Sequence, residues 1–149
     1  MPTAQRYEDL IVWQLAHELQ RDVFPSIASG PVSRDFRFCN QIRDASSSGP
    51  RNIAEGFGRF NPGDFARFLE IAKGSLMETH NHARDGYERG YFTEEQRERL
   101  CRLAGRAIKA AIPLIPISAV VRGFEKTHQS AFSRVGTREP GNPKEPEGT

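Results

Sequence analysis

The sequence predicts an all-α protein, an antiparallel up-and-down four-helix bundle, on the basis of three observations. Apolar residues recur at spacings of three and four along four segments, and no segment shows the alternation typical of a half-buried strand. Short breaks that contain glycine, proline or asparagine separate the segments. Amphipathic helices with short connections pack most simply as antiparallel neighbours. We expect the bundle to span residues 7–121 and a disordered polar tail to span 122–149.

The first helix is predicted over residues 9–27, with Asp9 as its N-cap. It carries two apolar rows. One row contains Val12, Leu15, Leu19 and Val23, and the other contains Leu10, Trp13, His17 and Phe24. A helix that is apolar on two sides is expected to pack on both. We therefore predict that Leu10, Trp13 and Phe24 contact a second protomer.

The second helix is predicted over residues 35–59, and Pro50 inside it should bend it. A polar row through Asn52, Glu55 and Arg59 runs beside its apolar row, and the last two side chains are spaced to pair on the helix. The row forms a solvated face if it is exposed, whereas burial would require polar partners. We favour a structural network that sets the register between helices over a catalytic role.

The third helix is predicted over residues 62–88. Asn61 suits its N-cap, Pro62 suits its first position, and Gly90 should end it. Gly74–Ser75 places small residues in mid-helix, where another backbone could approach closely.

The fourth helix is predicted to begin with a capping box at Thr93, and Pro113 and Pro116 should end it. Its most distinctive feature is a basic row at spacings of three, four and three, which consists of Arg99, Arg102, Arg106 and Lys109. Such a row is often a solvated face, but repeated around an oligomer it could bind nucleic acid. Aromatic residues do not interleave with it, so it does not itself indicate base stacking.

The glycine-rich stretch "GPRNIAEGFGRFNPGDFARF" does not match a phosphate-binding loop. The text "GFGRFNPG" lacks the G-x-G-x-x-G spacing and follows a predicted helix, and "AKGS" reverses the order of a P-loop. We interpret the stretch as the end of one helix, an asparagine cap and the start of the next.

Metal and catalytic sites are not indicated either. The nearest candidate metal ligands are Glu78, His80 and His82, each separated from the next by two positions. This spacing points successive side chains to different sides of a helix, so they make a poor ligand set and the histidines are expected to face solvent. No histidine or cysteine is placed to activate a nucleophile. We predict a protein that is not an enzyme, without catalytic residues, cofactor or metal; a metal-dependent or hydrolytic enzyme is the weakest hypothesis.

Charge and hydropathy suggest a cytoplasmic protein. The net charge is only +2, no apolar run reaches the roughly 20 residues of a membrane span, and the N-terminus lacks a signal-peptide pattern. Cys39 and Cys101 do not form a CxxC pair and are predicted to be small buried apolar residues.

The strings "YEDLIVWQLAHEL", "NQIRDASSSGPRNIAEGFGR" and "FARFLEIAKGSLMET" resemble the four-helix-bundle family named for proteins encoded in intervening sequences of 23S rRNA. The resemblance covers residues 7–112, and "NIAEGFGR" and "FLEIAKGS" are its most specific parts. It implies an up-and-down bundle that assembles as a ring-like homopentamer without known catalytic activity or cofactor. The sequence departs from the family at "SSSG", usually apolar, and at Asp44, often basic.

The same fold class includes accessory proteins of diversity-generating retroelements, which bind a reverse transcriptase and nucleic acid. Our leading hypothesis is a non-enzymatic homo-oligomer that associates with RNA or DNA through Arg99, Arg102, Arg106 and Lys109. The alternative is a protein–protein adaptor or accessory subunit of a reverse transcriptase.

Overall fold

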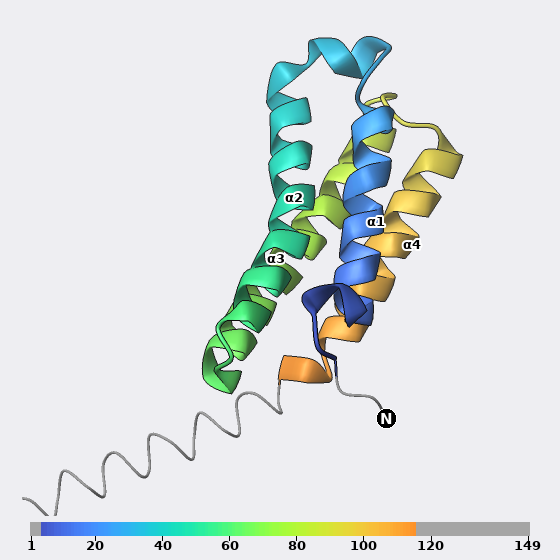
Figure 1. Cartoon of the computed structure of the whole chain (residues 1–149). Coiled ribbons are helices and arrows are strands. Elements are labelled where there is room, and N and C mark those ends of the chain that lie inside the picture. The colour runs from blue at the N-terminus through green and yellow to red at the C-terminus, as the bar shows by residue number, and fades with distance from the viewer. Residues whose placement is uncertain (1–3, 116–149) are drawn as a thin grey trace, which may run out of the picture.

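The computed structural model describes residues 4–115 and confirms the all-α four-helix bundle (Figure 1). One short 3₁₀ helix precedes the first α-helix and another follows it. In chain order the elements are η1 (Tyr7–Asp9), α1 (Ile11–Ser26), η2 (Pro31–Arg34), α2 (Phe36–Gly58), α3 (Pro62–Glu88) and α4 (Glu94–Ala111). The predicted tail at 122–149 and the last six residues of the predicted domain lie outside the described residues.

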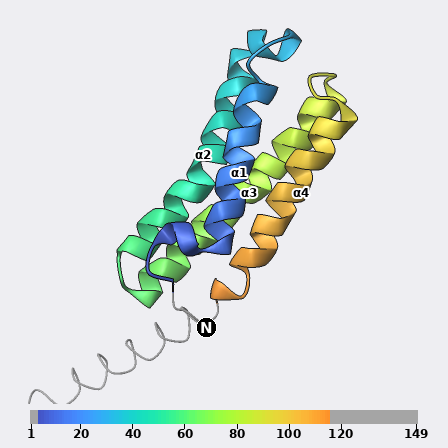
Figure 2. The same ribbon diagram turned by 45° about the vertical axis from the view of Figure 1, so that its right-hand side comes forward.

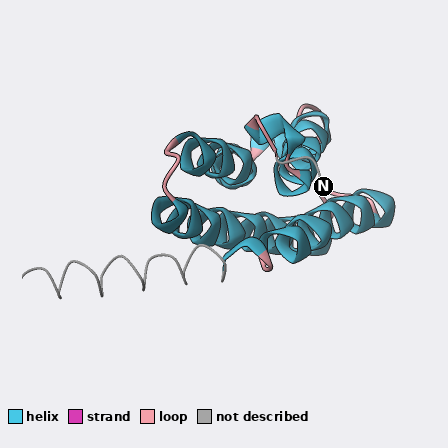
Figure 3. Cartoon of the chain, turned by 60° about the horizontal axis from the view of Figure 1, so that its bottom comes forward, coloured by secondary structure: helices cyan, strands magenta, loops and turns pink. Residues whose placement is uncertain are grey.

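The four helices run up and down, and each packs against two neighbours. α1 lies between α2 and α4, and α3 closes the square by contacting the same two helices (Figures 1 and 2). The α1–α2 and α3–α4 connections lie at one end of the bundle, while the α2–α3 turn and η1 lie at the other. Figure 3 shows only helices and loops in the described part of the chain.

The core lies along the axis between the helices. Leu19, Ile53, Leu69 and Leu100, one from each helix, are at most 1% exposed. The predicted inner row of α1 is confirmed, because all four of its members are buried. Burying such side chains supplies most of the free energy that holds an amphipathic helix in place.

The starts of two α-helices follow the capping residues read from the sequence. Asn61 accepts a hydrogen bond from the amide of Asp64, and Thr93 forms a complete capping box with Gln96. The predicted cap of α1 is wrong. Leu10 occupies that position, and Asp9 instead accepts hydrogen bonds from the backbone amides at the preceding turn.

Asp35 caps α2 and also bonds the α3–α4 loop to the start of this helix. Its side chain accepts hydrogen bonds from the amide of Phe38 (3.1 Å) and from the hydroxyl of Tyr91 (2.7 Å), which lies in the α3–α4 loop. The amide bond first, and then the Tyr91 bond, hold the pKa of Asp35 below its ordinary value. One carboxylate thus joins the start of α2 to a loop 56 residues away.

Gly56 in α2, rather than Gly74 in α3, permits a close approach of these two helices. A Cβ atom added at Gly56 would lie 2.6 Å from the Cβ of Phe68 in α3, whereas nothing lies within 4 Å of one added at Gly74. The predicted close approach at Gly74 is therefore wrong within this chain. α2 also continues through Pro50 as one helix.

Candidate nucleic-acid interface

The basic row of α4 lies on the outside of the bundle. Its four members are all exposed, and the buried seam of the same helix is formed by Leu100, Leu103, Ala104, Ala107 and Ala111. The capping box at Thr93 sets where the helix begins, and the 3.6-residue period then places the four members of the row away from the core. The spacing in the sequence thus located this face correctly.

Tertiary contacts divide the row into two parts. The Nε of Arg99 donates a hydrogen bond to Asp22, and its Nη2 lies 3.6 Å from the carboxylate of Glu18, both on α1. The hydrogen bond to Asp22 is the main reason why the pKa of Arg99 is raised above its ordinary value. Arg99 therefore links α4 to α1, and its charge is largely neutralised.

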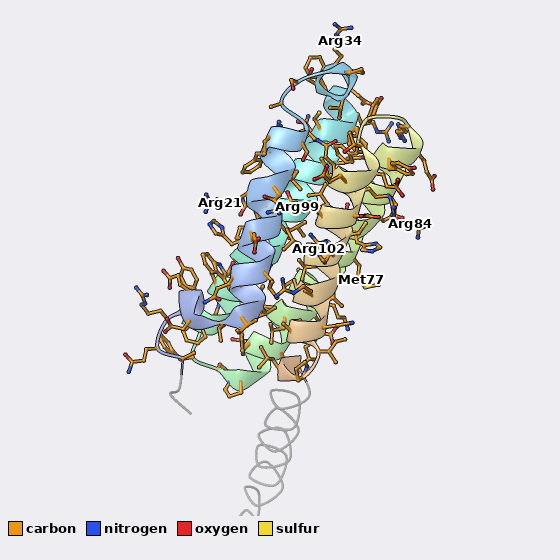
Figure 4. All side chains as sticks on the ribbon, turned by 90° about the vertical axis from the view of Figure 1, so that its right-hand side faces the viewer. Arg21, Arg34, Met77, Arg84, Arg99 and Arg102 are labelled. Atoms are coloured by element: carbon orange, nitrogen blue, oxygen red, sulfur yellow. The ribbon has the colours of Figure 1, made fainter. Side chains whose placement is uncertain are left out.

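The other three members remain free to meet a partner. Within residues 4–115, Arg102, Arg106 and Lys109 make no ion pair or side-chain hydrogen bond. Figure 4 shows Arg102 on the side of the bundle that α1 and α4 form, with Arg21 on α1 to its left. Arg21 is also exposed and has no acidic partner in the described chain. The result is a positive face that could contact phosphate groups.

The predicted polar row of α2 does not form one network. Glu55 and Arg59 pair at 2.9 Å, but both side chains are 48% exposed, and such surface pairs contribute little to stability. Asn52 is half-buried, and its amide donates to the hydroxyl and carbonyl oxygens of Ser48 one turn earlier. Asn52 is thus joined through the Ser48 hydroxyl to Ser75 in α3, whereas Glu55 and Arg59 form a separate pair on the surface of α2.

Serines in α2 and α3 provide polar links between the helices. The hydroxyl of Ser75 in α3 donates to that of Ser48 in α2 at 2.8 Å, and the Gln20 amide in α1 donates to Ser47 at 3.2 Å. Consecutive residues on a helix point about 100° apart, so Ser47 and Ser48 reach different neighbours. Three consecutive serines at positions 46–48 were the available signal.

The residues predicted to contact another protomer lie at the edge of the α1 core. Leu10 and Trp13 are half-buried and pack against the core, whereas Phe24 is 41% exposed. The indole of Trp13 stacks on His17, with ring centroids 4.6 Å apart, and meets Tyr7 edge-on. A role between protomers stays a prediction.

One histidine departs from the solvent-facing position expected for it. The His82 side chain is only 14% exposed and meets the Phe38 ring edge-on, and its Nε2 lies 3.5 Å from Glu78. No three metal-ligating side chains lie together within residues 4–115. Cys39 is buried as predicted, which raises the pKa of its thiol, but Cys101 is only half-buried.

An apolar cavity lies at the α2–α3 turn. Phe57, Phe60 and Phe65 line it together with residues 4–5, and its volume is about 510 Å³. Phe60 is 87% exposed and has a positive φ of 51°, a conformation that costs a non-glycine residue about 1 kcal/mol or more. An exposed aromatic held in this way is available to a partner.

Fold and surface together define the class: in residues 4–115, an all-α up-and-down four-helix bundle with a basic face on α4. Within the described residues, no helix is long and apolar enough to cross a membrane. The family model for 23S rRNA-intervening sequence proteins matches residues 8–111, and the chain belongs to this family.

Among solved structures, the chain is similar to a protein of unknown function from the S23 ribosomal protein family of Bacteroides thetaiotaomicron. The two are 22% identical with a TM-score of 0.64, and the match covers 70% of this chain and 98% of the other. At this identity the likeness shows the fold alone. A comparison with curated proteins gives no match.

Proposed function

We propose that this chain is a non-enzymatic, homo-oligomeric bundle that binds RNA or other nucleic acid through the outer face of α4. The observation that carries the proposal is the set of three neighbouring cations, Arg102, Arg106 and Lys109, that no acidic group in the described chain neutralises. Cations with this freedom release counterions from a phosphate backbone when they bind it.

Oligomerisation would make such a small face effective. Three phosphate contacts alone give weak, salt-sensitive binding, but several copies of the row around a closed ring would act together. The resemblance to the family implies a homopentamer, and Leu10, Trp13 and Phe24 are the proposed contacts. Native mass spectrometry or light scattering at micromolar concentration would test this step, and a monomer there would contradict it.

The nucleic-acid proposal is tested by replacing the three free cations with glutamine together. The matched control removes the same charge from exposed arginines elsewhere, by replacing Arg34, Arg37 and Arg67 with glutamine. Binding of a structured RNA is measured against salt concentration. The α4 variant should lose affinity at low salt, and the slope of log K against log salt should become shallower by about two to three. Equal losses in the α4 variant and the control would contradict the assignment to α4.

Arg99 offers a further internal comparison. Because it is already paired with Asp22, Arg99→Gln should change RNA affinity less than Arg102→Gln does. The reverse order would indicate that the α1 carboxylates release Arg99 on binding, and that the division of the row seen here is not the functional one.

The second candidate function is a protein–protein adaptor, including an accessory subunit of a reverse transcriptase. The apolar cavity around Phe60 favours it, because exposed aromatic side chains in a hollow are common anchors of protein interfaces. The test is co-purification with a reverse transcriptase encoded beside this gene, using Phe60→Ser as the variant expected to lose it. Absence of such a neighbouring gene would remove the support for this reading.

A further inference from the structure

A second cavity, of about 370 Å³, lies in the groove between α1 and α2. Tyr7, Trp13 and His17 form its aromatic side, and Gln20, Ser47 and Arg51 are its polar members. Its volume lies within the range of about 300–1,000 Å³ that is typical of small-molecule sites. It lies away from the α4 face, because it belongs to the other side of α1.

The aromatic side of the cavity consists of rings that already stack on one another. The Trp13 and His17 rings are nearly parallel, with an interplanar angle of 14°, and Tyr7 lies edge-on to the indole at a centroid distance of 5.2 Å. These contacts fix the rings before any ligand arrives, so little side-chain entropy would be lost on binding. A flat aromatic ligand can extend such a stack.

The polar members suit a ligand that also carries a negative charge. Arg51 is exposed and makes no ion pair within residues 4–115, and the cavity has no carboxylate in its lining. The Gln20 amide donates one N–H to Ser47, which leaves its oxygen and its second N–H without a partner in the described chain. A guanidinium matches phosphate geometry, and a carboxamide can both donate to and accept from a base edge.

We propose that this cavity binds a nucleobase with its attached phosphate, with the base extending the Trp13–His17 stack, Gln20 at the base edge and Arg51 on the phosphate. The proposal rests on the proposed nucleic-acid function only for its biological setting, because the cavity does not involve the α4 cations. It uses Trp13, which the oligomer proposal assigns to a contact with a second protomer, so the two roles of Trp13 exclude each other and dilution of the protein distinguishes them. The cavity would supply base contact, whereas the α4 face offers charge alone. Stacking of a base on an aromatic side chain contributes about 1–3 kcal/mol and tolerates any sequence.

The experiment uses the fluorescence of Trp13, which is the single tryptophan in the chain. The full-length protein is titrated with adenosine 5′-monophosphate and, separately, with a short single-stranded oligoadenylate, both at moderate salt. We expect saturable quenching of the indole emission. Quenching by both probes would identify a site for free nucleotides as well as strands, and quenching by the oligoadenylate alone would identify a strand site; either result supports the proposal.

Variants separate the cavity from other surfaces. Arg51→Gln should raise the Kd measured by quenching about tenfold. Arg67→Gln, which changes an exposed arginine on α3 outside the cavity, should leave that Kd unchanged. The α4 triple variant should keep the quenching by adenosine 5′-monophosphate even if it loses binding to structured RNA. Failure of the α4 proposal and failure of the cavity proposal are therefore distinguishable. Trp13→Phe, followed by calorimetry, reports binding without the fluorophore.

Three results would overturn the proposal. The first is unchanged emission with both probes. The second is equal quenching in the wild type and in Arg51→Gln, which would place the ligand elsewhere. The third is emission that shifts on dilution of the protein alone while the probes have no effect, because a second copy would then cover Trp13.

Discussion

Gly56 is the position where a single methyl group tests the packing of α2 against α3 most directly. Gly56→Ala adds a Cβ atom 2.6 Å from the Cβ of Phe68, and 3.2 Å from the ring of Phe65. The opposing Cβ is attached directly to the α3 backbone, so it cannot move aside by a rotamer change. The two helices would have to separate locally, or Phe68, which is buried, would have to shift with its backbone.

The size of the effect is best measured as a difference between two variants. Alanine is favoured over glycine in a helix interior by about 1 kcal/mol, and Gly74→Ala gains this with open space around the new methyl. Gly56→Ala gains a similar amount but adds an overpacking term of about 1–3 kcal/mol. The propensity term is common to both, so Gly56→Ala should be about 1–3 kcal/mol less stable than Gly74→Ala.

Urea denaturation followed by circular dichroism at one fixed protein concentration measures this difference, because association would make stability concentration-dependent. For a domain of about 100 residues, 1 kcal/mol corresponds to a shift of roughly 4–8 °C in Tm, which gives a second measurement. Equal stabilisation by both substitutions would refute the close approach of α2 and α3 at Gly56.

Three further predictions concern the caps. Asp35→Ala should lower the urea midpoint of the protein more than Tyr91→Phe does, because it removes both the cap on α2 and the acceptor of the Tyr91 hydroxyl; a smaller effect than that of Tyr91→Phe would contradict this. Since the folded pKa of Asp35 is lowered, its contribution is present above the unfolded pKa and lost as pH falls through the folded value. Asp35→Asn, which can still cap, should flatten that acid dependence. Thr93→Ala should lower the free energy of unfolding by about 1 kcal/mol, because it removes the capping box at the start of α4. Thr79→Ala, at a buried position, is the comparison, because it reports core packing instead. Comparable losses of stability in the two variants, with the helicity of α4 unchanged, would argue against the capping box.

Sequence pattern was sufficient for the helices because their signals are local. Asn61 with Pro62, and Thr93 with Gln96, satisfy backbone amides within one turn, so their roles can be read without knowing the neighbours. The outward position of the α4 cations follows from the same 3.6-residue period. The cap at Asp9 failed because a competing turn before α1 uses the same carboxylate.

Contacts between helices could not be read in this way. Whether Arg99 is free depends on Asp22, which is 77 residues earlier and comes opposite only when α1 and α4 pack side by side. The same reason hid the difference between Gly56 and Gly74, since both look alike within their own helices.

The sequence by itself therefore determined the fold class, the starts of α3 and α4 and the outward position of the α4 cations, because these depend on spacing and on groups a few residues apart. The tertiary structure alone decided which of those outward residues have partners. It placed Arg99 in an ion pair and left Arg102 free. It also brought Trp13 and Arg51 to one cavity, because partnership between helices depends on their relative placement.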